Sequence, residues 1–94
     1  MKSCCPPKWL HIFKAISDSH RQNILFLVNE HKKINATEII KKIKLSQSTI
    51  SHHLKILTDA GLIKVTKQGK NAIYSVEKEA IADCCLGYLH KISS

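Results

Sequence analysis

Long apolar runs are absent from this sequence of 94 residues. The longest one extends only from Ile24 to Val28, whereas a membrane-spanning helix needs about 20 apolar residues. The opening stretch MKSCCPPK also lacks the apolar segment that a signal peptide requires. We therefore expect a cytoplasmic protein without a membrane partner, and the length is that of one small domain.

Acidic residues and arginine are scarce as well. Lysine and arginine together number 15 against 7 acidic residues, which gives a net charge of +8, and Arg21 is the single arginine. This balance favours a polyanionic partner such as nucleic acid, although a basic surface that merely faces water is the alternative. With one arginine, bidentate contacts to guanine cannot dominate base recognition.

Capping and periodicity signals divide the chain into an extended leader, residues 1–7, and one domain, residues 8–94. Ser19 with Gln22 fits a capping box at a helix start, and Asn35 fits another helix start. Ser46 can cap a further helix, which Gly61 ends. The predicted helices are 8–16, 19–30, 36–43, 47–60 and 78–92.

Two alternating segments, 63–68 and 71–76, flank Gly69-Lys70 and predict a β-hairpin. Lys64, Lys67 and Lys70 lie on or near its tip, where they suit phosphate contact. The fold class is therefore mainly α with a two-stranded β-wing, in the order α-α-α-α-β-β-α. This order is that of a winged helix-turn-helix.

On a helical wheel, segment 47–60 separates into two faces. The polar face comprises Ser48, Ser51, His52, Lys55 and Asp59. The core-facing side comprises Ile50, His53, Leu54, Leu57 and Ala60. A helix that exposes such polar side chains after a tight turn reads base edges and phosphates in the major groove. The structural alternative is that the hydroxyls only cap the helix and the histidines are incidental, and for His53 we prefer a core position.

Three segments resemble the ArsR/SmtB family of winged-helix repressors. They are FKAISDSHRQNIL (13–25), LSQSTISHHLKILTDAGLI (45–63) and the wing VTKQGKNAIYSV (65–76). The resemblance implies a homodimer that binds double-stranded operator DNA and leaves it when a ligand, often a metal ion or metalloid, binds. Carried over by position, the DNA contacts are Gln47, Ser48, Ser51, His52, Lys55, Lys67 and Lys70.

The terminal helices predict the dimer interface. The last helix carries an apolar stripe of Ile81, Cys85, Tyr88, Leu89 and Ile92. The first helix offers Trp9, Leu10, Ile12, Phe13 and Ile16. So small a fold cannot cover both stripes from one side, and the family resemblance places these helices at a twofold seam.

The four cysteines form two adjacent pairs without the Cys-x-x-Cys spacing of zinc sites. Two sensor sites known in the family are excluded, because the corresponding segments of this chain do not resemble them. The arsenic-type box resembles ELCVCDL, where this chain has NATEIIKKI, and the zinc-type Asp-x-His start is missing from EKEAIADCCLGYLHK. What remains is Cys84-Cys85 with Cys4-Cys5, and His90 as a further candidate.

Thiolates select soft ions, and adjacent cysteines on a helix point about 100° apart. A third ligand must therefore come from elsewhere, and the leader could supply it across the dimer. We favour a three-sulfur site for trivalent arsenic or antimony, with cadmium and lead as further candidates and no obligatory cofactor. Alternatively, Cys85 is a small buried hydrophobe in the middle of the stripe, with Cys84 at its edge.

Other interpretations stay open. The same thiols could serve a repressor that responds to redox or sulfur species, or they could only pack in a repressor without a ligand. A winged helix can also be a protein-interaction module. An enzyme is not expected, because no Cys–His–acid arrangement or Gly-rich loop is visible.

Overall fold

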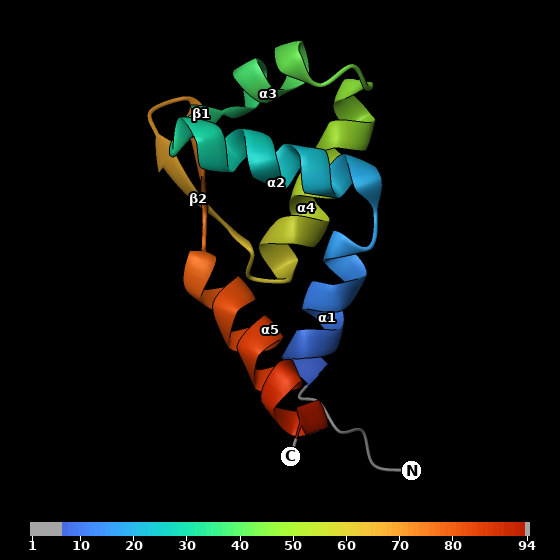
Figure 1. Cartoon of the computed structure of the whole chain (residues 1–94). Helices are drawn as coiled ribbons and strands as arrows, with labels where there is room; N and C mark the ends of the chain where they lie inside the picture. The colour runs from blue at the N-terminus through green and yellow to red at the C-terminus, as the bar shows by residue number, and fades with distance from the viewer. Residues whose placement is uncertain (1–6, 94) are drawn as a thin grey trace.

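The computed structural model describes residues 7–93, in which five helices are joined by a small antiparallel sheet that lies at one side of the molecule (Figure 1). The helices are α1 (Pro7–Ile16), α2 (Ser19–His31), α3 (Ala36–Lys42), α4 (Gln47–Asp59) and α5 (Lys78–Ser93). The strands are β1 (Ile34–Asn35), β2 (Ile63–Gln68) and β3 (Asn71–Val76). The described part has the predicted winged helix-turn-helix architecture.

Side chains that accept backbone N–H groups fix the helix starts. Asn35 caps α3 by accepting from the N–H of Glu38 at 2.8 Å, and the Ser46 hydroxyl caps α4 by accepting from the N–H of Thr49 at 3.2 Å. Both caps were predicted. At the other end of α4, Gly61 has a φ of 80°, a left-handed conformation that glycine adopts without strain.

The predicted capping box at α2 is wrong. The carboxylate of Asp18 accepts from the N–H groups of His20 and Arg21 at 2.8 and 3.1 Å, while Ser19 is already the first helical residue. A carboxylate serves two free N–H groups at once and also favours the positive end of the helix. The Gln22 side chain instead donates to the carbonyl of Ile16 at 2.7 Å.

The hairpin has the predicted bounds, and β2 pairs with β3 from Ile63↔Val76 to Gln68↔Asn71. The sheet also contains a third strand that the sequence did not predict. In β1, Ile34 pairs with Tyr74, which gives the strand order β1-β3-β2. Two residues are too few to show the alternation that reveals a strand.

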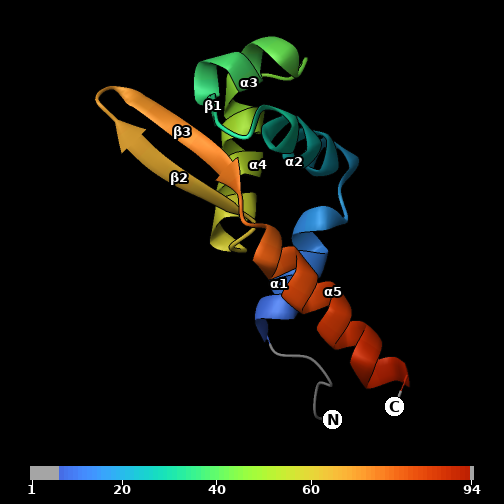
Figure 2. The same ribbon diagram turned by 60° about the vertical axis from the view of Figure 1, so that its left-hand side comes forward.

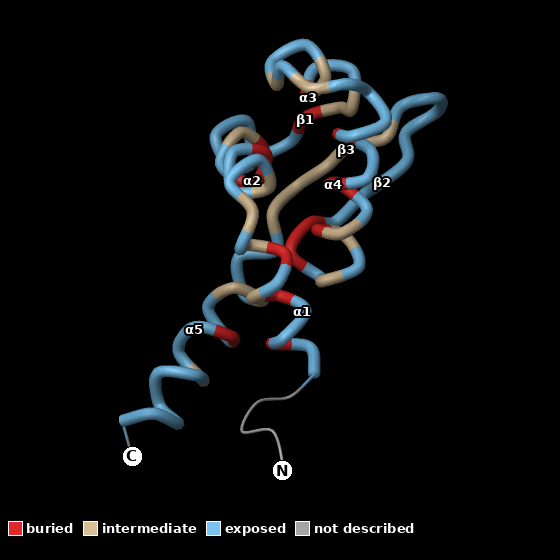
Figure 3. Tube along the Cα trace, turned by 90° about the vertical axis from the view of Figure 1, so that its right-hand side faces the viewer, coloured by how far each residue is buried: buried red, intermediate tan, exposed pale blue. Residues whose placement is uncertain are grey.

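The core lies where α2 crosses α4, and most of it comes from the apolar faces of α1, α2 and α4, with single residues from α3, α5, β1 and β2. α5 runs away from this core beside α1, so that the molecule measures 46 × 22 × 19 Å (Figure 2). α5 contributes only Cys84 to the fully buried residues of the described part. Figure 3 shows the buried segments of α1 and α5 facing each other, while the end of α5 is exposed.

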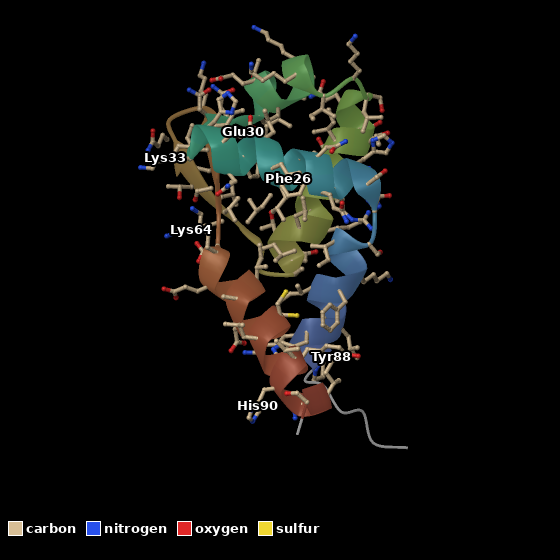
Figure 4. All side chains as sticks on the ribbon, in the orientation of Figure 1. Phe26, Glu30, Lys33, Lys64, Tyr88 and His90 are labelled. Atoms are coloured by element: carbon tan, nitrogen blue, oxygen red, sulfur yellow. The ribbon has the colours of Figure 1, made fainter. Side chains whose placement is uncertain are left out.

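Side-chain contacts fix α5 to α1. The indole Nε1 of Trp9 donates to Asp83 at 3.2 Å. The rings of Phe13 and Tyr88 meet edge to face, with their centroids 5.2 Å apart, and Figure 4 labels Tyr88 on α5. The indole of Trp9 also lies against Gly87. A Cβ at Gly87 would come within 2.5 Å of the ring atom Cζ2, so a glycine is needed here.

α2 ends in a strained turn. Lys32 has φ 62° and ψ −47°, and the N–H of Lys33 donates to the carbonyl of His31 at 2.6 Å. These values describe a γ-turn centred on Lys32, a conformation that is rare and strained for a residue with a side chain. The turn leads directly into β1.

Candidate nucleic-acid interface

The two faces of α4 lie as the sequence predicts. Ile50, His53, Leu54 and Leu57 are buried. The exposed residues include Thr49 and the six predicted DNA-facing or stripe residues Gln47, Ser48, Ser51, His52, Lys55 and Asp59. The polar stripe therefore faces solvent along the whole helix, with no apolar side chain interrupting it.

The hydroxyls at the start of α4 divide into two groups. Ser46 and Thr49 serve the helix itself, since their hydroxyls lie 2.7 Å apart and Ser46 also caps the backbone. Ser48 lies 3.3 Å from Ser46 and shares in this network. Within the described residues, the side chains of Gln47 and Ser51 make no hydrogen bond, so they remain available for a ligand. Capping thus explains part of the polar composition of this segment, and the exposed stripe explains the rest.

The wing places lysines beside α4. Because successive side chains of a strand point to opposite faces, Val65 and Lys67 share one face of β2 while Lys64 points to the other. Val65 lines a hollow together with Ser51 and Lys55 of α4. Lys67 therefore lies on the side of the wing that faces α4, and Lys70 lies in the turn at its tip.

The charge of Lys55 is partly compensated. Its Nζ lies 3.4 Å from a carboxylate oxygen of Asp59, one turn further along the helix. Both side chains are well exposed, so this pair contributes little to stability. Lys55 can exchange Asp59 for a phosphate at small cost.

His53 occupies the predicted core position and is 8% exposed. Its Nδ1 lies 3.2 Å from the Arg21 guanidinium, whose Nε also donates to the carbonyl of Ala15 at 2.6 Å. Burial is the main cause that lowers the pKa of His53, and it is opposed by the charge of Asp18. The side chain of Arg21 on α2 thus joins α1, α2 and α4, and it is not part of the exposed polar stripe of α4.

The cysteines differ from the prediction. Cys84 is fully buried against α1, whereas Cys85 is exposed. In the single chain, the alternative in which Cys85 is a small buried hydrophobe and Cys84 lies at the edge of the stripe is therefore reversed. The face of α5 that packs on α1 is centred on Cys84, and Cys85 is turned about 100° away from it. Cys4 and Cys5 lie outside the described residues.

Large apolar side chains remain uncovered on the terminal helices. Leu10 is 50% exposed, Leu89 55% and Ile92 62%. Leu86, which the predicted stripe did not include, is 65% exposed. Exposed apolar residues gathered on two adjacent helices are typical of an interface.

Within residues 7–93, no three His, Cys, Asp or Glu side chains come close enough together to hold a metal ion. Nor could any helix in this part of the chain span a lipid bilayer.

Known proteins match this arrangement. The profile of the family described as "Bacterial regulatory protein, arsR family" matches residues 18–65, from the cap of α2 into the wing. The chain belongs to the ArsR family. It is accordingly a DNA-binding transcriptional regulator and not an enzyme.

Curated relatives support the same assignment. An uncharacterized HTH-type transcriptional regulator of Methanocaldococcus jannaschii is 38% identical over 76 residues, which are 81% of this chain and 85% of that protein. An arsenical resistance operon repressor of Bacillus subtilis is 31% identical, over 79% of this chain and 70% of that protein. A CadC homolog of Staphylococcus aureus, described as a cadmium resistance regulator, is 33% identical over 74% of this chain and 58% of its own length.

Solved structures confirm the fold. An ArsR-like transcriptional regulator from Rhodococcus sp. RHA1 has a TM-score of 0.82 at 23% identity and covers 93% of this chain and 80% of that one. HlyU from Vibrio cholerae has a TM-score of 0.71 at 28% identity, over 92% and 91% of the two chains. A domain from Mycobacterium bovis that is described as a homodimeric winged helix-turn-helix has a TM-score of 0.73 at 19% identity, over 88% and 77%.

Proposed function

We propose that this ArsR-family repressor binds its operator as a homodimer and is released when a thiophilic metal or metalloid binds to cysteine thiolates. The observation that carries the DNA-binding part is the uninterrupted polar stripe of α4, flanked by Lys67 and Lys70 of the wing. Gln47, Ser48, Ser51 and His52 would meet base edges and Lys55 a phosphate. With Arg21 engaged inside the protein, few contacts select guanine, and salt-sensitive backbone contacts dominate.

The exposed apolar residues of α1 and α5 support the dimer. Leu10, Leu86, Leu89 and Ile92 would be covered by the same face of a second copy, as in an isologous twofold interface. The dimer would present two α4 helices to successive major grooves, roughly 34 Å apart. A structurally similar ArsR-type domain is described as homodimeric.

The placement of the vicinal cysteines supports a thiol-based inducer site. Cys85 lies on the exposed face of α5 and Cys84 on the face packed against α1. An ion that binds both thiolates must draw Cys84 out of its packing, which shifts α5 relative to α1. Because α1 is joined to α4 through Arg21, such a shift can reach the recognition helices.

The third ligand must come from elsewhere, since the described residues contain no third donor at this position. We assign it to Cys4 or Cys5 of the same chain or of the partner. Three sulfur ligands suit arsenite or antimonite best, with cadmium and lead as soft divalent alternatives. Relatives described as arsenical and cadmium resistance regulators agree with this class of inducer.

The experiment is a titration of sodium arsenite into the wild-type protein bound to a fluorescent duplex recovered by binding-site selection. Release should reflect a coupling free energy of about 1–3 kcal/mol, a loss of affinity of roughly 5- to 150-fold. Cys84→Ser and Cys85→Ser should each abolish release while retaining DNA binding. Release that persists in both variants contradicts the site. Where release is lost in both, Cys4→Ser and Cys5→Ser identify whether a leader cysteine supplies the third ligand.

The exposure of Cys85 favours a second candidate, a repressor that responds to peroxide or persulfide. An exposed thiol is accessible to small oxidants, whereas the buried Cys84 is not. Peroxide would then release DNA without arsenite, and the product would appear by mass spectrometry as a disulfide or an added sulfur or oxygen. Release by arsenite alone, without a change in mass after denaturation, supports the metalloid.

A further inference from the structure

We infer that a basic hollow between α1 and α4 binds a backbone phosphate of the DNA, so that α1 is part of the nucleic-acid interface. This inference rests on the proposed DNA-binding function and extends it to residues outside the helix-turn-helix and the wing. The hollow has a volume of about 550 Å³, and its polar lining consists of His11, Lys14, Arg21, His52 and Asp59. We call it the α1 hollow.

The charge of the α1 hollow is strongly positive. Lys14 and Arg21 contribute two full charges, and neither makes an ion pair with a carboxylate inside residues 7–93. His11 and His52 add ring N–H donors. The one acidic residue of the lining, Asp59, already has Lys55 at 3.4 Å. A hollow with this lining attracts an anion and repels a cation.

Hydrogen-bond donors remain available after the internal contacts are satisfied. Arg21 uses three of its donors, on the carbonyls of Ala15 and Lys14 and on Nδ1 of His53. A guanidinium has five N–H donors, so two are left. The side chain of Lys14 is exposed and follows His11 by three residues, which places both on one face of α1.

With α4 in a major groove, the α1 hollow would lie beside the phosphate strand on the edge of the groove opposite the wing. The stripe of α4 has two flanks, because Ser51 and Lys55 line a hollow shared with the wing, whereas His52 lines the one shared with α1. The wing and α1 lie on different sides of α4 (Figures 1 and 2). A major groove is about 12 Å wide and has phosphates along both edges.

A helix seated in the groove therefore has one phosphate strand beside the wing and the other beside α1. Lys67 and Lys70 serve the first strand, and Lys14 with the free donors of Arg21 serves the second. The sequence does not indicate this role, because the apolar residues of α1 are typical of a dimerisation helix. Its polar residues become significant only because α1 lies beside α4.

The test compares Lys14→Gln with wild type by fluorescence anisotropy on two duplexes, one recovered by binding-site selection and one scrambled. A phosphate contact carries no sequence information, so affinity should fall by the same factor on both, roughly tenfold at physiological salt. The slope of log affinity against log salt should decrease by about two for the dimer, one contact for each subunit. His11→Gln should produce a smaller loss in the same direction.

Lys78→Gln is the matched control. It removes the same charge from an exposed lysine that lies with Phe26 in a groove between α2 and α5, away from the α4 stripe, and it should leave both affinities unchanged. Unfolding curves of all variants should coincide, since none of these side chains is buried.

Failure of this inference differs from failure of the proposed function. If wild type binds both duplexes and Lys14→Gln behaves as Lys78→Gln does, the α1 hollow is not a DNA contact. If wild type binds neither duplex, the proposed function itself is wrong. A saturable shift of the His11 resonances on addition of inorganic phosphate, with DNA affinity unaffected by Lys14→Gln, would show a site for a free anion and would overturn the DNA assignment.

Discussion

The guanidinium of Arg21 lies 3.2 Å from Nδ1 of His53, and this contact joins the start of α2 to the buried face of α4. Because a guanidinium can only donate, Nδ1 of His53 must accept, and the imidazole is neutral. Protonation of this nitrogen would break the contact and bring two positive charges together beneath the recognition helix. The contact therefore makes the stability of the fold sensitive to pH.

The pH dependence has a defined sign. Burial, together with the charges of Arg21, His20 and His52, lowers the pKa of His53 below its ordinary value of 6.5, against the opposing effect of Asp18. A lowered pKa means that the contribution of His53 to stability is complete above pH 6.5 and is lost as the pH falls through the lowered value. Urea unfolding between pH 5 and pH 8 should show this loss of stability in wild type.

His53→Asn isolates the effect, because an amide oxygen can accept from Arg21 but does not titrate. The variant should lose less stability than wild type between about pH 6.5 and pH 5. Parallel curves for the two proteins would show that His53 does not titrate in this range.

Gly87 should not tolerate a side chain. In an exposed helix, glycine to alanine raises stability by about 1 kcal/mol, but at Gly87 a Cβ would meet the indole of Trp9. Overpacking of this kind costs about 1–3 kcal/mol. We therefore expect Gly87→Ala to lower the free energy of unfolding in urea. An increase would mean that α5 lies further from α1 than the structure shows.

Lys32→Gly should stabilise the protein by about 1 kcal/mol, since glycine removes the penalty of a positive φ. Lys33→Gly is the control, because Lys33 does not have a positive φ. Glycine at this position only raises the conformational entropy of the unfolded chain, which lowers stability. The midpoint of thermal unfolding should rise in Lys32→Gly and fall in Lys33→Gly. Equal shifts would contradict the γ-turn at the end of α2.

Leu89→Glu should convert the proposed dimer to a monomer, as a carboxylate on the uncovered face of α5 cannot be buried without a partner. Leu89 is 55% exposed in the single chain, so the fold itself should survive. Phe26→Glu on α2, also an exposed apolar position (Figure 4), is the control and should remain dimeric. Sedimentation velocity distinguishes the two results.

Local chemistry explains which elements could be predicted from the sequence. The hairpin has the predicted bounds because two short alternating segments flank a Gly-Lys turn, and the caps at Asn35 and Ser46 follow from single side chains that accept nearby N–H groups. The choice between Asp18 and Ser19 as the cap of α2 failed, because both residue types cap helices and only the geometry separates them.

Tertiary packing decided the features that the sequence could not give. α5 is apolar on two sides, one packed on α1 and one uncovered. The apolar pattern of the sequence does not separate these sides, so it predicted a single stripe that included Cys85. The close approach of Trp9 to Gly87 turns Cys84 inward. The role inferred for Lys14 likewise depends on α1 lying beside α4, which no local pattern records.

In the proposed function, the exposed stripe of α4 reads duplex DNA. The most direct measurement is the affinity of the triple variant Ser48→Ala, Ser51→Ala and His52→Ala for the selected duplex at ordinary ionic strength. All three side chains are exposed, so the fold should remain intact by circular dichroism. We expect the preference for the selected duplex over the scrambled one to disappear, and an undiminished preference would contradict the account.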